Sequence, residues 1–284
     1  MPGIRDYEPL FDGWKIQKLL GRGSYGEVYE VSKQIMGITQ HSAVKQISIS
    51  GMDLKKTPKL LVMAKAEIES MLRMRESSHI VRIEEFATKK WKEDDGQDIL
   101  IRMELLTSLE TIIGYGTKTM PVEEIRKLGI HICNILEICE EESIIHGDIK
   151  PSNIFRSKRG NYKLGDFGIA RIMVEGKAST YVGAQNFMVP EVYMGGKKYD
   201  RRADIYSLGI TLYYLLNGNR FPFEGEEHDG MPLVRRMMGE KLPMPNGEGI
   251  PQELARAALK ACEYNPNDRF ESAALMREAL EQSQ

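Results

Sequence analysis

Residues 146–168 read His-Gly-Asp-Ile-Lys-Pro-Ser-Asn-Ile-Phe, then a short basic insert, then Lys-Leu-Gly-Asp-Phe-Gly. Four polar residues stand close together in this stretch: Asp148, Lys150, Asn153 and Asp166. Carboxylate and amide oxygens are ligands that suit Mg²⁺, and a carboxylate can also accept the proton of an attacking hydroxyl. We therefore expect one carboxylate to orient a hydroxyl nucleophile, and the other, with the amide, to hold Mg²⁺ on a triphosphate.

The composition is that of an ordinary soluble globular protein. The chain has 284 residues, 42% hydrophobic and 28% charged, enough for one large domain or two lobes. The net charge of −2 argues against a nucleic-acid-binding surface and against general attraction to anionic membranes. No apolar run reaches the roughly 20 residues of a transmembrane helix, and residues 1–11 do not resemble a signal peptide. We expect no membrane contact within this chain.

The three cysteines, Cys133, Cys139 and Cys262, are too few and too badly spaced for a zinc site or a disulfide framework. Reduced thiols in a cytoplasmic protein fit them best. Cys133 and Cys139 fall in a helical apolar pattern, so we expect both to pack in a core. Nothing in the sequence defines the oligomeric state.

The glycine-rich stretch Gly21, Gly23 and Gly26 precedes Val28 near the start of the chain. Glycine lets the backbone approach a phosphate closely because no Cβ intrudes. The same spacing also occurs in dinucleotide-binding turns and in flexible hairpins. A dinucleotide-binding turn leads into a helix, whereas residues 27–31 continue as a strand. Phosphate binding and a plain hairpin both stay open on this stretch alone.

Lys45 lies in the predicted strand 42–47, on the face opposite Val44. It is either an exposed edge lysine or a phosphate-binding lysine held by a carboxylate. Ala43 is small enough to lie against a flat ring.

The carboxylate has candidates in the next helix, which we expect to begin with Thr57 as N-cap and Pro58 at its first position. Glu67 and Glu69 both lie in this helix, and Glu67 shares a face with Met71 one turn later. A solvated glutamate is the alternative for either.

Further strands are predicted at 80–87 and 99–104, and the acidic stretch 92–98 is predicted to be a solvated hairpin turn.

After residue 106 the pattern becomes helical. We predict an amphipathic helix at 122–142, a buried helix at 204–217, closing helices at 252–263 and 272–282, a short helix near 233–238, and a hairpin of 154–155 with 162–164. Asp204, at the start of the buried helix, could cap it or accept hydrogen bonds from neighbouring backbone.

Several motifs occur in one order along the chain. They are Gly21-x-Gly23-x-x-Gly26-x-Val28, Ala43-Val44-Lys45, His146-Gly147-Asp148, Lys150-x-x-Asn153, Asp166-Phe167-Gly168, Val189-Pro190-Glu191, Asp204-x-Tyr206-Ser207-x-Gly209 and Arg269. The ordered set resembles the eukaryotic-type (Hanks-type) serine/threonine protein kinase catalytic domain over about residues 12–282. In style the sequence is similar to the bacterial branch of that family.

The resemblance implies an α+β, bilobal protein kinase fold. Residues 1–104 would form a small lobe with an antiparallel sheet and one main helix. Residues 105–284 would form a larger, mainly helical lobe, and the two would make one kinase domain. Many such relatives carry further regions after this domain, so a longer, membrane-anchored parent protein is an open alternative.

The resemblance also implies roles for matching residues. Asp148 would orient the acceptor hydroxyl, Lys150 would stabilise charge on the γ-phosphate, and Lys45, paired with Glu67, would contact the α- and β-phosphates. Asn153 and Asp166 would hold Mg²⁺, for which Mn²⁺ could substitute. The residues implied to bind ATP are Leu20, Gly21, Gly23, Ser24, Gly26, Val28, Ala43, Lys45, Met103, Glu104, Leu106 and Phe155, with Ile154 as an alternative to Phe155. Met71, Ile83, His146 and Phe167 match an apolar column that links the lobes in active relatives; ordinary core packing is compatible with this.

The chain departs from the family at two positions. Gly147 replaces the usual arginine, which receives a phosphate on the activation segment. Phosphorylation of Ser179, Thr180 or Tyr181 is therefore not expected to be required for activity. Ala184 replaces the usual threonine, whose hydroxyl would bridge Asp148 and Lys150, so we expect reduced activity or an unusual acceptor.

The resemblance further implies a buried ion pair of Glu191 with Arg269, for which a surface arginine is the alternative reading. The function we expect is Mg-ATP-dependent phosphorylation of protein serine or threonine, including autophosphorylation, in a form that lacks the arginine before the catalytic aspartate. The alternatives are a pseudokinase, which would act as a nucleotide-binding or scaffolding module, and a kinase of small molecules. Gly147 and Ala184 favour the pseudokinase, whereas the intact Lys45 and Asp148 oppose it.

Overall fold

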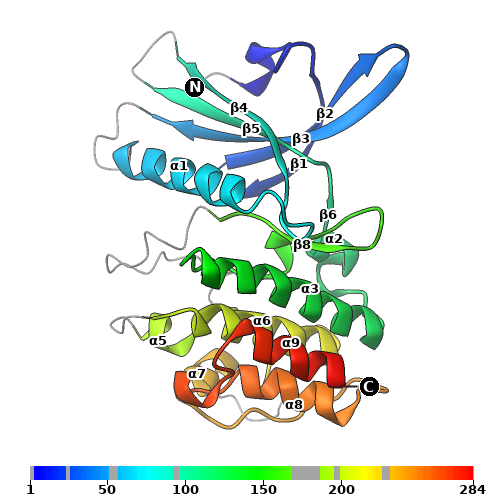
Figure 1. The fold of residues 1–284 in the computed structure, drawn as a ribbon, viewed down its shortest axis with the longest axis vertical. Coiled ribbons are helices and arrows are strands. Elements are labelled where there is room, and N and C mark those ends of the chain that lie inside the picture. Colours follow the sequence, from blue (N-terminus) through cyan, green and yellow to red (C-terminus); the bar gives the residue numbers. More distant parts are fainter. Residues whose placement is uncertain are drawn as a thin grey trace. The chain divides into compact units, whose positions relative to one another are not determined.

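The computed structural model describes residues 3–23, 26–50, 57–91, 96–167, 186–194, 199–225 and 231–283. The chain forms two compact units, Met1–Glu76 with Val81–Leu106, and Ser77–Ile80 with Thr107–Gln284. The first unit holds an antiparallel sheet and one long helix, and the second is mainly helical (Figure 1). The predicted α+β class is thereby confirmed.

The first unit is built on a five-stranded antiparallel sheet in the order β1-β2-β3-β5-β4. Its elements are η1 (Ile4–Tyr7), β1 (Lys15–Gly23), β2 (Gly26–Ile35), β3 (Ile38–Ile49), α1 (Thr57–Arg73), β4 (Ile83–Lys90) and β5 (Gln97–Met103). The glycine-rich stretch joins two strands and leads into no helix, as predicted. Because β3 is the central strand, Lys45 is not an edge lysine.

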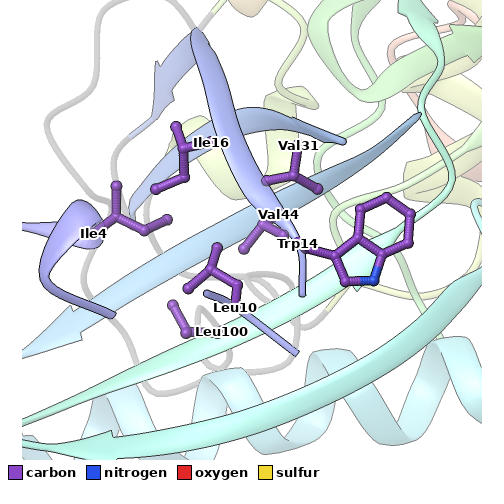
Figure 2. Packing of buried hydrophobic residues seen from close by; sticks show 7 residues of the cluster. All are labelled: Ile4, Leu10, Trp14, Ile16, Val31, Val44 and Leu100. Atoms are coloured by element: carbon purple, nitrogen blue, oxygen red, sulfur yellow. The ribbon is translucent and has the colours of Figure 1, made fainter. Parts of the chain in front are cut away.

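Both faces of this sheet are covered. On one face, residues such as Ile47 and Ile101 pack with Ile68 of α1. On the other, Ile4, Leu10 and Trp14, all of which precede the first strand, pack on the sheet. Figure 2 shows them with the strand residues Ile16, Val31, Val44 and Leu100. This second layer was not predicted, although the apolar and aromatic residues at positions 4, 7, 10 and 14 are its signal in the sequence.

Two local predictions in the first unit were wrong. Asp98 does not lie in a solvated turn: it belongs to β5 and is completely buried. Three side chains donate hydrogen bonds to its carboxylate, which offset the loss of water. The strand predicted from residue 80 begins at Ile83, and Ile80 instead bridges Leu164 within the second unit. Residues 92–95 of the predicted turn lie outside the described chain.

The second unit is assembled around α6, which is buried on nearly every side as predicted. Its helices are α2 (Leu109–Ile112), α3 (Val122–Glu141), α5 (Pro190–Tyr193), α6 (Arg202–Leu216), α7 (Pro232–Met237), α8 (Gln252–Ala261) and α9 (Ala273–Gln282), with the 3-10 turns η2 (Gly114–Gly116), η3 (Pro151–Asn153) and η5 (Pro266–Asp268). The predicted hairpin is β7 (Ile154–Arg156) with β8 (Tyr162–Leu164), and β6 (Thr107–Ser108) extends it. The predicted helix boundaries differ from these by one or two residues.

The three cysteines are free and buried. Cys133 and Cys139 lie on the buried stripe of α3, which confirms the prediction of core packing. Burial raises the pKa of all three thiols, that of Cys262 to about 12, so they remain protonated at neutral pH. Among the described residues, no helix is both long enough and apolar enough to span a bilayer.

Candidate active site

Lys45 and Glu67 form a buried ion pair within the first unit. The Lys45 Nζ lies 2.7 Å from Glu67 Oε1 and 3.0 Å from Oε2, and the side chains are 11% and 6% exposed. Buried charges require such a partner, because removal from water is costly. The predicted pair is confirmed. Glu69 lies on the surface, with its Oε1 3.7 Å from Lys65 Nζ. It is the solvated glutamate that was the alternative for this position.

The candidate ATP-binding residues of the first unit follow the strand register. Gly21 lies opposite Val28, and Val28 lies opposite Lys45. Ala43, which is buried, lies opposite Met103. At Gly26 a Cβ atom would lie 2.0 Å from the carbonyl oxygen of Gln46, so only glycine fits.

Glu104 follows the last residue of β5. Its N–H donates to the carbonyl of Arg82 at 3.1 Å, and its Oε1 accepts the N–H of Arg82 at 2.8 Å. The N–H is thus used within the unit. Leu106 is half-buried at the end of this unit, and Leu20 is 41% exposed.

The second unit brings Asp148, Lys150 and Asn153 together. Asp148 Oδ2 accepts hydrogen bonds from Lys150 Nζ at 2.7 Å and from Asn153 Nδ2 at 3.0 Å. Asn153 Nδ2 also donates to the carbonyl of Asp148 at 2.8 Å. The amide nitrogen is therefore committed, which leaves the amide oxygen to act as a ligand. No described residue donates a hydrogen bond to Asp148 Oδ1.

His146 ties this loop to the backbone before Asp166. Its Nδ1 accepts the N–H of Asp148 at 3.2 Å, and its Nε2 lies 3.0 Å from the carbonyl oxygen of Gly165. Since a carbonyl only accepts, Nε2 carries the proton and the ring is neutral. The ring also packs edge-on against Phe167, with centroids 4.6 Å apart. Asp166 itself has a left-handed φ of 65°, a strained conformation often found at functional sites.

Asp204 binds the backbone of the same loop through its carboxylate. Its Oδ2 and Oδ1 accept the N–H groups of His146 and Gly147, each at 2.7 Å. Burial raises the pKa of the carboxyl, and the two N–H groups oppose this by favouring the charged form. Of the two predicted roles for Asp204, the structure shows the second: it accepts from neighbouring backbone and does not cap α6.

Gly147 has a φ of 74°, in the left-handed region. A residue with a Cβ atom would pay about 1–2 kcal/mol there. From the sequence, this position was interpreted only as the loss of a phosphate-binding arginine. The backbone conformation gives a second reason for glycine, because glycine adopts this φ without strain and its N–H then reaches Asp204.

Glu191 and Arg269 form the predicted buried pair. Two parallel hydrogen bonds of 2.8 Å join the carboxylate to the guanidinium, and the side chains are 8% and 0% exposed. Arg269 also donates to the carbonyls of Glu263, Arg202 and Tyr264. These contacts exclude the alternative of a surface arginine.

The remaining candidates divide into placed and undescribed residues. Phe155 is half-buried in β7, opposite Lys163, whereas Ile154 is completely buried. Met71 is buried and Ile83 is half-buried in the first unit. Outside the described residues lie Ser24, Gly168, Ser179, Thr180, Tyr181 and Ala184.

A histidine pair near the candidate site was not foreseen. The rings of His79 and His131 lie 4.3 Å apart. His79 Nδ1 lies 3.0 Å from the Tyr162 carbonyl, and the Tyr162 N–H donates to His131 Nδ1 at 3.1 Å. The pair therefore fixes β8 against α3, provided that His131 Nδ1 is unprotonated.

This arrangement predicts acid sensitivity. Burial and the neighbouring His79 lower the pKa of His131 to about 4, from an ordinary value of 6.5. Between these pH values, His131 binds a proton in the unfolded chain but not in the folded chain. The free energy of unfolding therefore falls as the pH drops from about 6.5 to 4, by on the order of 1 kcal/mol for this half-exposed ring. Urea unfolding at several pH values measures the effect. His131→Asn, which keeps an acceptor but does not titrate, should show a shallower slope; an equal slope would contradict the assignment.

The sequence matches the protein kinase domain family over residues 14–282. The chain therefore belongs to this family, as its motifs predicted. The geometry agrees in two contacts that the resemblance implied, the ion pair of Lys45 with Glu67 and that of Glu191 with Arg269.

Individual relatives differ in the acceptor that their names state. Serine/threonine-protein kinase PknB of Mycobacterium leprae is 29% identical over 277 residues, which are 95% of this chain and 43% of the relative. The dual specificity mitogen-activated protein kinase kinase hemipterous of Drosophila melanogaster is 36% identical over 61% of this chain and 15% of its own length. Tyrosine-protein kinase MasK of Myxococcus xanthus is 38% identical over 54% of this chain and 24% of its own length. The chain thus spans less than half the length of these relatives.

Proposed function

We propose that this chain is an active kinase that transfers the γ-phosphate of Mg-ATP to serine or threonine hydroxyls of proteins, itself included. The observation that carries the proposal is the Asp148 carboxylate. Lys150 and Asn153 hold its Oδ2, while no described residue donates to its Oδ1. That oxygen is suited to accept the hydrogen bond of an acceptor hydroxyl and to orient it for attack.

The first unit supplies groups suited to the nucleotide. Lys45, kept in place by Glu67, is a cation for the α- and β-phosphates, and the glycines at positions 21, 23 and 26 would let the phosphates approach the backbone closely. The Glu104 carbonyl and the Leu106 backbone would bind the adenine, with Val28 and Ala43 against its ring.

The donor set of the second unit fits Mg²⁺. The Asn153 amide oxygen and the Asp166 carboxylate are hard oxygen ligands, and Mg²⁺ needs only one or two such side chains beside phosphates and water. Bound Mg-ATP supplies the phosphoryl group and neutralises the charge that develops on its oxygens. Lys150, 2.7 Å from Asp148, adds a positive charge where the γ-phosphate would meet the acceptor.

Two sequence features support the finer assignments. A lysine two residues after the catalytic aspartate, as Lys150 follows Asp148, matches the serine/threonine form of the family. Gly147 cannot bind a phosphate on the activation segment, so activity should not depend on phosphorylation there.

The three buried thiols suit a reducing cytoplasm, where we place the reaction.

The test is transfer of phosphate with Mg-ATP, followed by mass spectrometry of the intact chain and of a generic basic protein. We expect phosphoserine and phosphothreonine on both, and none after Mg²⁺ is removed with a chelator. Nucleotide binding without transfer would instead identify a pseudokinase. Phosphotyrosine as the main product would contradict the proposed acceptor.

A further inference from the structure

The N-terminal segment, residues 4–14, precedes the first strand and, except for its last residue, lies before the region that matches the kinase family. It contacts β5 at three alternate residues: Asp98, Leu100 and Arg102. Alternate residues of a strand share one face. The segment therefore covers one whole face of the strand that ends at Met103.

At the start of β5, the segment is fixed by a hydrogen bond from the half-buried Tyr7 to the buried Asp98. The Tyr7 hydroxyl donates to Asp98 Oδ2 at 2.5 Å, beside Trp91 Nε1 at 2.9 Å, and Ser48 Oγ donates to Oδ1 at 2.5 Å. Burial and the Asp98 carboxylate raise the pKa of Tyr7, which keeps it a donor. Asp98 thus joins the segment to β3, β5 and the end of β4.

In the middle of β5, the contact is apolar. Leu10 is completely buried and Ile4 is 4% exposed, and both belong to the cluster that contains Leu100 (Figure 2). The backbone of Leu10 also exchanges two hydrogen bonds with Trp14, of 2.9 and 2.8 Å, which close the segment into a tight loop.

At the end of β5, the contact is between a cation and aromatic rings. The Arg102 guanidinium lies 4.7 Å from the centre of the Trp14 ring and 5.9 Å from that of Phe11. Glu84 and Glu85 of β4 pair with the same guanidinium. Arg102 directly precedes Met103 and Glu104, the residues proposed to meet the adenine.

The opposite face of β5 belongs to the catalytic side of the unit. Ile99 and Ile101 pack with α1, the helix that carries Glu67, and Ile101 is the β3 partner of Lys45. The N-terminal segment and α1 therefore enclose the same strand from its two faces.

We propose that residues 4–14 position β5, and through it the adenine-binding residues 103–106, so that this segment sets the affinity for ATP. The inference rests on the proposed function for its ligand only. Tyr7, Leu10 and Phe11 act as positioning residues: they touch the strand and not the nucleotide.

The experiment uses the full chain and two variants, Tyr7→Phe and Leu10→Ala. Matched controls in the second unit are Tyr162→Phe, which also loses one hydroxyl bonded to a carboxylate, and Leu254→Ala, which also truncates a completely buried leucine. The dissociation constant for ATP is measured by calorimetry in the absence of an acceptor, and amide hydrogen exchange is followed over residues 98–104.

We expect the two segment variants to weaken ATP binding by roughly threefold to tenfold, since a hydrogen bond to a charged group is worth more than a factor of ten, and to speed exchange over residues 98–104. The controls should lose comparable thermal stability and change neither quantity. Segment variants that change both quantities no more than their controls would overturn the inference alone. A wild-type chain that binds no ATP would overturn the proposed function as well.

Discussion

Replacement of Asp148 by Asn is expected to slow phosphoryl transfer by about 10²–10⁴-fold, the usual contribution of a positioned acid or base. The amide has the size of the carboxylate but cannot accept the hydroxyl proton. At the Oδ2 position its N–H₂ group would accept from neither Lys150 nor Asn153, whereas Oδ2 accepts from both. The single-turnover rate and the dissociation constant for ATP, measured together, distinguish an effect on phosphoryl transfer from an effect on binding. The rate should fall and the affinity for ATP should change little.

A control variant is Asp268→Asn, an exposed aspartate in η5 of the same unit. It should leave both quantities unchanged. A transfer rate in Asp148→Asn within a factor of a few of the wild type would show that Asp148 is not the residue that orients the acceptor. Loss of folding would be visible in the circular dichroism spectrum, and is not expected because the substitution conserves volume.

The grouping of the catalytic-loop residues could be predicted because they are local in the sequence. Asp148, Lys150 and Asn153 lie within six residues, but their direct hydrogen bonds were not predicted. Lys45 with Glu67, and Glu191 with Arg269, are distant in sequence, and no periodicity relates them. Only the order of motifs, compared with a known family, could pair them, and the structure confirms both pairs.

Asp98 shows why the rest could not be predicted. It stands among charged residues that are typical of a solvated turn, and composition therefore placed it in water. Its burial depends on donors from three separate segments, Tyr7, Ser48 and Trp91, which only the folded sheet assembles. The histidine pair of His79 with His131 is a similar case, since each residue alone resembles a surface polar group.

Gly147 shows a different limit. From the sequence, Gly147 was interpreted as the loss of the arginine that would bind a phosphate on the activation segment, and thus as a difference in regulation. The left-handed backbone and the bond to Asp204 make glycine favourable for the local structure as well. Sequence alone gives the identity of the residue but not its φ angle, and therefore cannot separate these two reasons.

Arg269→Met is expected to lower the free energy of unfolding by about 3–5 kcal/mol, because it leaves the Glu191 carboxylate buried without its partner. The guanidinium is fully buried, and it also donates to three backbone carbonyls, which would lose their donors. Glu191→Gln should cost less, since the amide still accepts one of the two hydrogen bonds. Urea unfolding of each variant gives the values.

The double variant Glu191→Gln with Arg269→Met decides whether the cost arises from an uncompensated charge. If it does, the double variant should be more stable than Arg269→Met alone, because the orphaned carboxylate is gone. The partly exposed pair of Arg277 with Glu137 provides a contrast: at 26% and 29% exposure, Arg277→Met should cost only about 1 kcal/mol or less. Equal losses for the Arg269 and Arg277 variants would mean that burial does not govern the strength of the Glu191 pair.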